Sequence, residues 1–277
     1  MYTLGPSEYA QAKPLVQAME YHLAIAAIFD RTAPAKIYVD HPTHPHAALI
    51  STRRRFYLAG SEDDDEFNAA VGRLFAEIIF PQARQAGEPL LVLYYAPDRW
   101  EKVINARWKD KFPNKRQRQY YTFDHLKNDW RTMLPKDYSL RCIDQALVDT
   151  QHLKNLDRLT SEMRAERASA EDFLRAGFGV CLIHGDEVAG WCLSEYNCAG
   201  SCEVGIETIE AYQKRGFATL MASALIEQAL SRGISRIGWD CYADNAPSVA
   251  TARRVGFRKV DDYFVYVAWL NANDRQN

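Results

Sequence analysis

A junction between a strand-like segment and a helix-like segment constrains this chain more than any other feature. The alternating residues CEVGIETIEAY (202–212) predict a strand, and the apolar run TLMASALIEQAL (219–230) predicts a helix. The sequence QKRGFA, from Gln213 to Ala218, lies between them. The first N–H groups of a helix have no intrahelical partner, and with the helix dipole they attract anions. The junction therefore predicts an anion site at a β–α turn.

The residues of the junction suit a phosphate or a pyrophosphate. Gly216 permits unusual backbone angles and lets a ligand approach the backbone closely. Ala218 keeps the first helical turn uncrowded, and Lys214 and Arg215 add two cations. A tight turn with solvated cations is the alternative interpretation. Neither G-x-x-x-x-G-K-[ST] nor G-x-G-x-x-G occurs, which argues against a nucleotide triphosphatase or a dinucleotide dehydrogenase.

Composition excludes several other classes of protein. The 277 residues, 47% hydrophobic and 25% charged, are typical of a soluble globular chain of one or two domains. A formal net charge of −2 provides no field that would attract nucleic acid or an anionic membrane. The N-terminus lacks a signal-peptide pattern, and the run LAIAAIF is too short to span a bilayer, so we expect a cytoplasmic protein. The six cysteines lack a C-x-x-C pair, and we expect reduced thiols and no metal site.

The periodicity predicts an α+β fold with a βαβ-like unit across residues 202–241. The first half predicts one helix over residues 8–30, three strand-like runs, a helix capped by Ser61, and a buried strand in EPLLVLYYA. The chain ends with two predicted strands in FRKVDDYFVYVAWL. A break in periodicity at NDWRTMLPKD predicts a boundary between a domain of residues 1–135 and a domain of residues 136–277.

Two segments carry charges or ligand-type side chains without a firm pattern. The basic residues 101–119 could bind nucleic acid or another protein, but a solvated helix followed by a loop is the preferred interpretation, because no interleaved aromatic platform accompanies them. The tract HPTHPH (41–46) could bind a metal, but its prolines favour a turn between two strands. Trp100, Trp108 and Trp130 are expected to be aromatic anchors at the domain junction.

The junction and the elements after it resemble the GNAT superfamily of acyl-CoA-dependent N-acyltransferases. Gln213-x-x-Gly216-x-Ala218 is similar to the family's [RQ]-x-x-G-x-[GA] pyrophosphate loop. The strand containing GWDCY, then Asn245 and a short helix ending in VGF, resemble a further family element. This resemblance covers most of residues 138–277. Across the whole chain, including VDHPTHPHAALI, YYTFD and LPKDYSLRCID, the arrangement is similar to the zwittermicin A-resistance-like subgroup.

The resemblance implies a GNAT fold, a mixed and mostly antiparallel sheet flanked by helices, in the C-terminal half. The preceding α/β domain would be a degenerate GNAT-like half that shapes the acceptor site or an interface and does not bind coenzyme A (CoA). The strand before the loop would separate from its neighbour to admit the pantetheine arm of acetyl-CoA, the acyl donor. The implied cofactor-binding residues are Thr208, Ile209, Gln213, Lys214, Arg215, Gly216, Phe217, Ala218, Thr219, Asn245 and Ser248. For Asn245, a helix N-cap is the alternative role, and the two are compatible.

The implied reaction moves an acetyl group to a primary amine of a small molecule. An alkyl ammonium with a pKa of about 10.4 costs about 4.6 kcal/mol to deprotonate at pH 7. Protonation of a thiolate leaving group with a pKa of about 8.5 is worth only about 2 kcal/mol. A base is therefore needed before an acid. The candidate bases are Glu207 and Asp240, then Glu203, which alternation places on one face of neighbouring strands. Each could instead be structural, for example paired with Arg215 or Arg253.

The sequence departs from the family pattern at Ala252, where many members have a tyrosine that protonates the thiolate. Tyr242 and Tyr212 are candidate substitutes, and the thiolate could also leave unaided or through water. The departure leaves room for a non-catalytic acyl-CoA sensor as the alternative function. The expected partners are a small-molecule amine and, as an option, a second copy in a homodimer, with no nucleic acid and no membrane.

Overall fold

Apolar runs form most strands of this computed structural model, which describes residues 1–150, 152–167 and 169–270. The chain divides into two compact units. Unit 1 contains Met1–Gln117 and the residues from Tyr263 onward, and unit 2 contains Arg118–Asp262. The predicted boundary near residue 135 therefore differs from the observed division. The reason is strand pairing, because residues 118–122 pair within unit 2 and the chain's last strand ends in unit 1.

Unit 1 is a sheet covered by helices. Its strand order is β1 (Tyr2–Leu4), β2 (Lys36–Val39), β3 (Ala47–Thr52), β4 (Arg55–Gly60), β5 (Leu90–Ala96) and the end of β12 (Phe257–Trp269). The pair β4/β5 is parallel, and the other recorded pairs are antiparallel. The helical segments are η1 (Pro6–Met19), α1 (Leu23–Phe29), α2 (Asp65–Leu74), η2 (Phe75–Ile79), α3 (Phe80–Gln85) and α4 (Trp100–Arg107).

Three details of unit 1 differ from the sequence prediction. The single helix expected over residues 8–30 is a 3₁₀ segment, η1, followed by α1, and Pro14 removes a backbone donor inside η1. The cap of α2 is Asp64, whose carboxylate accepts the Phe67 N–H at 2.9 Å, instead of Ser61. The wide turn η2 shifts the helical register, so Ile78 is exposed although Phe75 is buried.

Unit 2 repeats this arrangement with a longer set of strands. Its strand order is β7 (Tyr138–Cys142), β8 (Gly179–His184), β9 (Glu187–Cys198), β10 (Ser201–Thr208), β11 (Arg236–Tyr242), β6 (Asn114–Phe123) and the start of β12. The pair β10/β11 is parallel, as the βαβ prediction requires, and its recorded neighbours are antiparallel. The α+β class with a mostly antiparallel sheet is thus confirmed.

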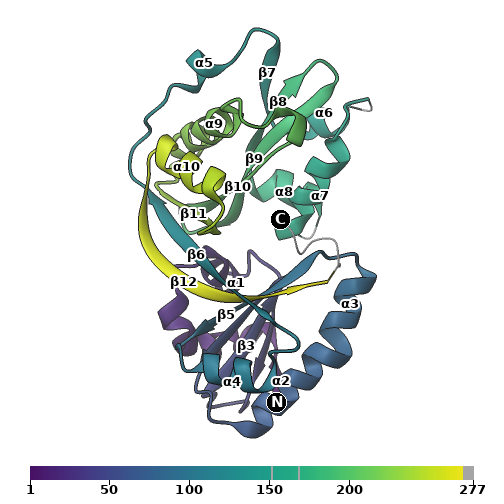
Figure 1. The fold of residues 1–277 in the computed structure, drawn as a ribbon, viewed down its shortest axis with the longest axis vertical. Helices are drawn as coiled ribbons and strands as arrows, with labels where there is room; N and C mark the ends of the chain where they lie inside the picture. Colours follow the sequence, from purple (N-terminus) through teal and green to yellow (C-terminus); the bar gives the residue numbers. More distant parts are fainter. Residues whose placement is uncertain (151, 168, 271–277) are drawn as a thin grey trace. The chain divides into compact units, whose positions relative to one another are not determined.

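The helices of unit 2 position the strands that matter for the site. They are α5 (Trp130–Met133), α6 (Gln145–Val148), α7 (Leu156–Glu166), α8 (Ala170–Ala176), η3 (Glu210–Tyr212), α9 (Phe217–Ser231) and α10 (Ala246–Val255). Helix α9 packs against β8, β9 and β10, and α10 packs against α9 and β11 (Figure 1). Helix α9 carries apolar residues on almost every face, so Phe217 and most residues to Ile226 are buried.

Two strands carry the remaining differences from prediction. Residues 257–269 form one strand, β12, where two were expected. Strand β6 includes residues 114–119, which were predicted as a loop because their side chains are charged or polar, whereas its buried side chains are the following Tyr120 and Tyr121. The tryptophans expected at the domain junction are divided between the cores. Trp100 and Trp108 are buried in unit 1, whereas Trp130 packs against the core of unit 2. Among the described residues, no helix combines the length and apolarity needed to cross a membrane.

Candidate functional site

Strands β10 and β11 are paired over a short distance and then separate. Their parallel register ends at the pair Glu203↔Gly238. Beyond it, β10 stays paired with β9 as far as Thr208, and β11 stays paired with β6 as far as Tyr242. Because each strand follows a different neighbour, a wedge opens between their facing edges. This separation, implied by the family resemblance, is present in the register, and Glu203 and Gly238 mark its apex.

The loop after β10 presents unpaired backbone amides at the open end of the wedge. Lys214 has φ of 62° and Gly216 has φ of 83°, both in the left-handed region. Within the described ranges, the amides from Lys214 to Thr219 have no hydrogen-bond acceptor, and Leu220 N–H is the first to find one, at Gly216 O (3.1 Å). A Cβ added to Gly216 would meet nothing within 4 Å, so the glycine is needed for its backbone angles and faces open space.

Gln213 fastens this loop to the strand. Its side-chain Nε2 donates to the backbone carbonyl of Thr208 at 3.1 Å, which ties the start of the loop to the end of β10. Among the described residues, the buried hydroxyl Oγ1 of Thr208 has no hydrogen-bond partner, and Thr208 lines the same pocket. An unsatisfied buried hydroxyl is costly unless a ligand or water completes it. The end of β10 is thus built to receive a polar group.

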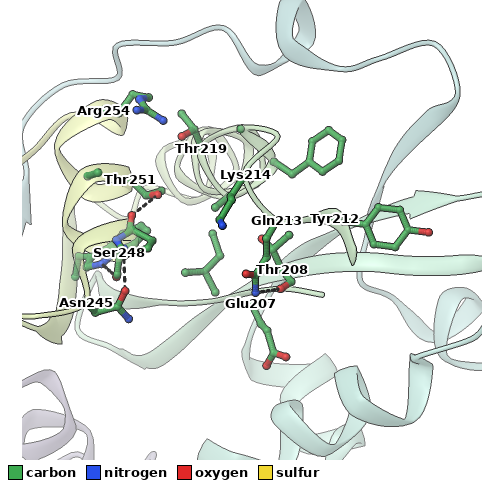
Figure 2. Close-up of a pocket in the computed structure, with 17 residues that line it drawn as sticks. Glu207, Thr208, Tyr212, Gln213, Lys214, Thr219, Asn245, Ser248, Thr251 and Arg254 are labelled. Atoms are coloured by element: carbon green, nitrogen blue, oxygen red, sulfur yellow. Dashed lines mark hydrogen bonds between the residues drawn. The ribbon is translucent and has the colours of Figure 1, made fainter. Parts of the chain in front are cut away.

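A pocket of about 600 Å³ joins the loop, the wedge and α10 (Figure 2). Figure 2 shows the Lys214 amine between the α9 loop and α10, with Ser248, Thr251 and Arg254 on the α10 wall. The lining is Ile206, Glu207, Thr208, Tyr212, Gln213, Lys214, Gly216, Phe217, Ala218, Thr219, Trp239, Asn245, Pro247, Ser248, Ala250, Thr251 and Arg254. Two cations and a row of free amides therefore face one cavity, which suits a polyanion.

Most of the predicted cofactor-binding residues meet in this pocket. Two of them do not line it. The Ile209 N–H donates to Ala189 O, and the Arg215 guanidinium donates to the Tyr138 hydroxyl at 3.2 Å. The ones that line it are Thr208, Gln213, Lys214, Gly216, Phe217, Ala218, Thr219, Asn245 and Ser248.

Helix α10 contributes residues that the sequence analysis missed. Asn245 is its N-cap, with Oδ1 accepting the Ser248 N–H at 3.1 Å, so the alternative role holds while Asn245 also lines the pocket. The Ser248 hydroxyl accepts from Trp239 Nε1 at 3.0 Å. Thr251 and Arg254 follow Ser248 at intervals of three residues, and this helical spacing from a predicted site residue was the available signal.

The three candidate carboxylates have different surroundings. Glu207 pairs with Arg158 of α7, both half-exposed, and its carboxylate points away from α10 in Figure 2. Asp240 accepts from Arg118 Nε at 2.9 Å, and both side chains are 11% exposed. Glu203 is buried, at 7% exposure, beside the apex of the wedge. The ion pairs expected with Arg215 or Arg253 are replaced by pairs with Arg158 and Arg118.

Neither candidate thiol acid is well placed. The Tyr212 hydroxyl donates to Glu187 at 2.7 Å, and this hydrogen bond, with burial, raises the pKa of Tyr212 to about 12. Tyr212 lines the pocket, but its hydroxyl points away from Lys214 and α10 in Figure 2. Tyr242 lies under the Arg118 guanidinium, 4.6 Å from ring centroid to Cζ. Ala252 is fully buried. The described pocket lining therefore offers no tyrosine with a readily lost proton.

The two ambiguous segments acquire structural roles. Between β2 and β3, the His41 ring accepts the backbone N–H groups of Thr43 and His44, as the turn interpretation predicted. Among the described residues, no group of three or more His, Cys, Asp or Glu side chains could hold a metal, and all six cysteines are free thiols. In the basic segment, Arg107 pairs with Asp65 and Lys115 pairs with Glu101, which neutralises part of its charge.

The chain is similar in sequence and in fold to known N-acetyltransferases and GNAT proteins. The chain is 25% identical over 264 residues to "Uncharacterized N-acetyltransferase YdfB" of Bacillus subtilis (strain 168), covering 95% of this chain and 97% of the relative. A GCN5-related N-acetyltransferase-like protein from Streptococcus suis 89/1591 has a TM-score of 0.68 at 22% identity, covering 95% and 99% of the two chains. A tandem GNAT protein from the clavulanic acid biosynthesis pathway has a TM-score of 0.57 at 13% identity, covering 97% and 98%.

The likeness to these structures is one of fold along nearly the whole length, and the tandem protein accords with the repeated strand order of units 1 and 2. A model of GNAT acetyltransferases matches residues 13–266, which include both the separated strands and the pocket. The chain belongs to the GNAT acetyltransferase family.

Proposed function

We propose that this protein transfers an acetyl group from acetyl-CoA to a primary amine of a small molecule. One observation carries the proposal: β10 and β11 separate after Glu203↔Gly238, and the same pocket collects the free amides at the start of α9. A wedge between strands accepts a narrow arm, and free amides accept a diphosphate. The narrower likeness to the zwittermicin A-resistance-like subgroup is part of this proposal.

The residues present fit CoA along its length. The amides from Lys214 to Thr219 would hold the diphosphate, and Lys214 and Arg254 would add charge. Thr208, with its unsatisfied hydroxyl, and the backbone at Ile209 would follow the pantetheine arm, which Asn245 would meet from the opposite wall. When bound, acetyl-CoA supplies an activated thioester carbonyl.

The protein's own task is to remove a proton from the acceptor. The acceptor nitrogen can attack only after its ammonium form is deprotonated, which costs about 4.6 kcal/mol at pH 7 for an alkyl amine. A carboxylate that receives this proton, directly or through an ordered water, is the main chemical aid that we assign. Glu203, Glu207 and Asp240 are the candidates, and the position of Glu203 at the apex favours it. The thiolate leaves unaided or through water, since Ala252 replaces an acid.

Unit 1 is not proposed as a second CoA site. Its parallel strands β4 and β5 remain paired from Arg55↔Val92 to Ala59↔Ala96, so no comparable wedge is present in the recorded register. The helix that follows β4 begins with Asp64, Asp65 and Glu66, whose charges repel a diphosphate. We infer a degenerate GNAT-like unit that shapes the acceptor side or an interface.

Calorimetry with CoA tests the binding part of the proposal. We expect one CoA per chain, with binding that weakens as salt rises. Lys214→Gln should weaken binding several-fold and reduce the salt dependence, because one cation leaves the pocket. Lys109→Gln, at an exposed residue of unit 1, is the matched control and should bind as the wild type does. Absence of CoA binding by folded protein would contradict the proposal.

A thiol-release assay with acetyl-CoA and a panel of amines tests the reaction. We expect release that depends on the amine, and a loss of about a hundred-fold or more for the neutral variant of the true base among Glu203→Gln, Glu207→Gln and Asp240→Asn. Binding without release for every amine would support the acyl-CoA sensor, which the buried Ala252 leaves open. Unchanged turnover in all three variants would contradict the role of a carboxylate base.

A further inference from the structure

Gly238 leaves room for two polar side chains at the apex of the wedge. A Cβ added to Gly238 would be 2.4 Å from the Tyr120 hydroxyl and 3.0 Å from Cγ of Glu203. Real Cβ atoms do not make contacts this short with well-packed neighbours. The Tyr120 hydroxyl and the Glu203 side chain therefore converge on one face of Gly238, at the last residue pair before the strands separate.

Tyr120 lies between two carboxylates from different strands. It is on β6, directly opposite Asp240 of β11 in the register, and Asp240 already accepts from Arg118. Tyr120 is 8% exposed and Glu203 is 7% exposed, so water screens the group weakly. Burial raises the pKa of Tyr120 well above its usual value, and the charges of Glu203 and then Asp240 raise it further. The phenol therefore keeps its proton at working pH and can act as a hydrogen-bond donor.

We propose that Tyr120 is a positioning residue of the acetyl transfer, whose hydroxyl donates to the Glu203 carboxylate and holds it at the apex to receive the proton of the acceptor ammonium. The inference rests on the proposed function and deepens it. In this step the N–H bond of the ammonium breaks, an O–H bond to Glu203 forms, and the nitrogen keeps the electron pair with which it attacks. The proton later leaves Glu203 for water.

The surroundings of Glu207 make it a weaker choice for this step. Glu207 lies four residues beyond the apex on β10, and its partner is the Arg158 guanidinium. An acceptor ammonium would have to displace that guanidinium. Glu203 instead adjoins a neutral donor that stays in place while the carboxylate takes a proton. Loss of the Tyr120 hydroxyl should therefore affect the reaction if Glu203 is the base, but not if Glu207 is the base.

The pH dependence follows from the charged groups around Tyr120. A hydrogen bond donated to an ionised carboxylate favours the ionised form. Removing it in Tyr120→Phe should move the acid limb of the kcat/KM profile to higher pH, by on the order of one unit. The titratable and charged groups that face Tyr120 from the neighbouring strands are Glu203, Cys202, Asp240, Arg236 and, through Asp240, Arg118.

The test measures pH–rate profiles of wild type, Tyr120→Phe and Tyr95→Phe with acetyl-CoA and a responsive amine. We expect Tyr120→Phe to show the upward shift and a kcat about ten-fold lower at pH 7, with unchanged CoA affinity, because Tyr120 does not line the CoA pocket. Tyr95→Phe is the matched control, since Tyr95 donates to Glu101 in unit 1 and is half-buried. It should leave the profile unchanged.

Gly238→Ala provides a second variant that leaves Tyr120 itself in place. Its Cβ would displace the Tyr120 hydroxyl, so the same upward shift is expected. In the double variant Tyr120→Phe/Gly238→Ala, the shift should not exceed that of Tyr120→Phe alone, because the hydroxyl is already gone. Additive shifts would mean that Gly238→Ala acts by another route and would overturn the proposal.

Failure of this inference is distinguishable from failure of the proposed function. If wild type binds CoA and turns over but the profile of Tyr120→Phe matches it, the positioning role is wrong and the function stands. If Glu207→Gln, and not Glu203→Gln, removes the acid limb, the assignment of the base is wrong. If wild type neither binds CoA nor releases thiol, the proposed function fails, and the positioning role fails with it.

Discussion

At the scale of single residues, the site is surrounded by side chains whose charges are paired inside the protein. Arg118 and Asp240 are the clearest case, since both are 11% exposed and 122 residues apart in sequence. A buried pair of this kind adds little net stability, but removing one partner leaves an uncompensated charge. Its presence beside Tyr120 gives the apex of the wedge a fixed electrostatic environment.

We predict that Arg118→Met lowers the free energy of unfolding by about 3 kcal/mol, because the Asp240 carboxylate is left buried without its cation. Urea titration followed by tryptophan fluorescence measures the change. Lys154→Met is the control, because Lys154 pairs with Asp186 at the surface and its loss should leave the unfolding curve unchanged. Equal curves for Arg118→Met and wild type would contradict the argument.

Tyr212 makes a second prediction at this scale, on pH and stability. Its pKa is raised to about 12 in the folded state, from about 10 in the unfolded state. The contribution of Tyr212 to the free energy of unfolding is therefore complete below pH 10 and is lost as pH rises through 12. Wild type should lose about 1 kcal/mol relative to Tyr212→Phe between pH 9 and pH 11. Urea midpoints at the two pH values measure this, with the exposed Tyr2→Phe as a control that follows wild type.

At the scale of elements, helix α9 is the part of the site whose form local sequence explains best. The residue before its first turn has a left-handed backbone, which Gly216 adopts without strain, and its apolar faces are buried among neighbouring strands. Strand β6 is the opposite case. Its segment KRQRQ has no apolar alternation, and the strand forms because residues 118–122 pair with β11, where Arg118 contacts Asp240.

The two ends of α9 permit a matched test of Gly216. Gly216 (φ 83°) precedes the helix, and Gly233 (φ 75°) follows it, and a Cβ on either would meet nothing within 4 Å. We predict that Gly216→Ala and Gly233→Ala each cost about 1 kcal/mol of stability through backbone strain. Only Gly216→Ala should weaken CoA binding, because it distorts the amides that face the pocket. Calorimetry showing equal affinities would contradict that role.

At the scale of the whole molecule, two strands contribute residues to both compact units. The last strand, β12, reaches unit 1, where Tyr266 pairs with Leu93 of β5. Strand β6 reaches unit 2, where Tyr121 is fully buried in the core. A cut at the predicted boundary would therefore remove a core strand from unit 2.

We predict that a fragment of residues 136–277 does not fold, because it lacks β6 and leaves Asp240 without Arg118. A fragment of residues 118–262 keeps the part of β6 that pairs with β11 and should be the better folded of the two. Circular dichroism and cooperative thermal unfolding distinguish them. A cooperative transition in 136–277 that matches that of 118–262 would show that β6 is dispensable.

The sequence by itself determined the β–α junction, the glycine-containing loop before α9 and most of the α9 and α10 pocket wall, because these depend on residues within a few turns of one another. Only the tertiary structure decided that β6 is a strand, that Arg158 and Arg118 are the partners of Glu207 and Asp240, and that Tyr120 meets Glu203 over Gly238. Those contacts join residues far apart in the chain. A charged side chain is buried only when a partner, often distant in sequence, offsets the cost of its desolvation. No local sequence pattern therefore predicts these contacts.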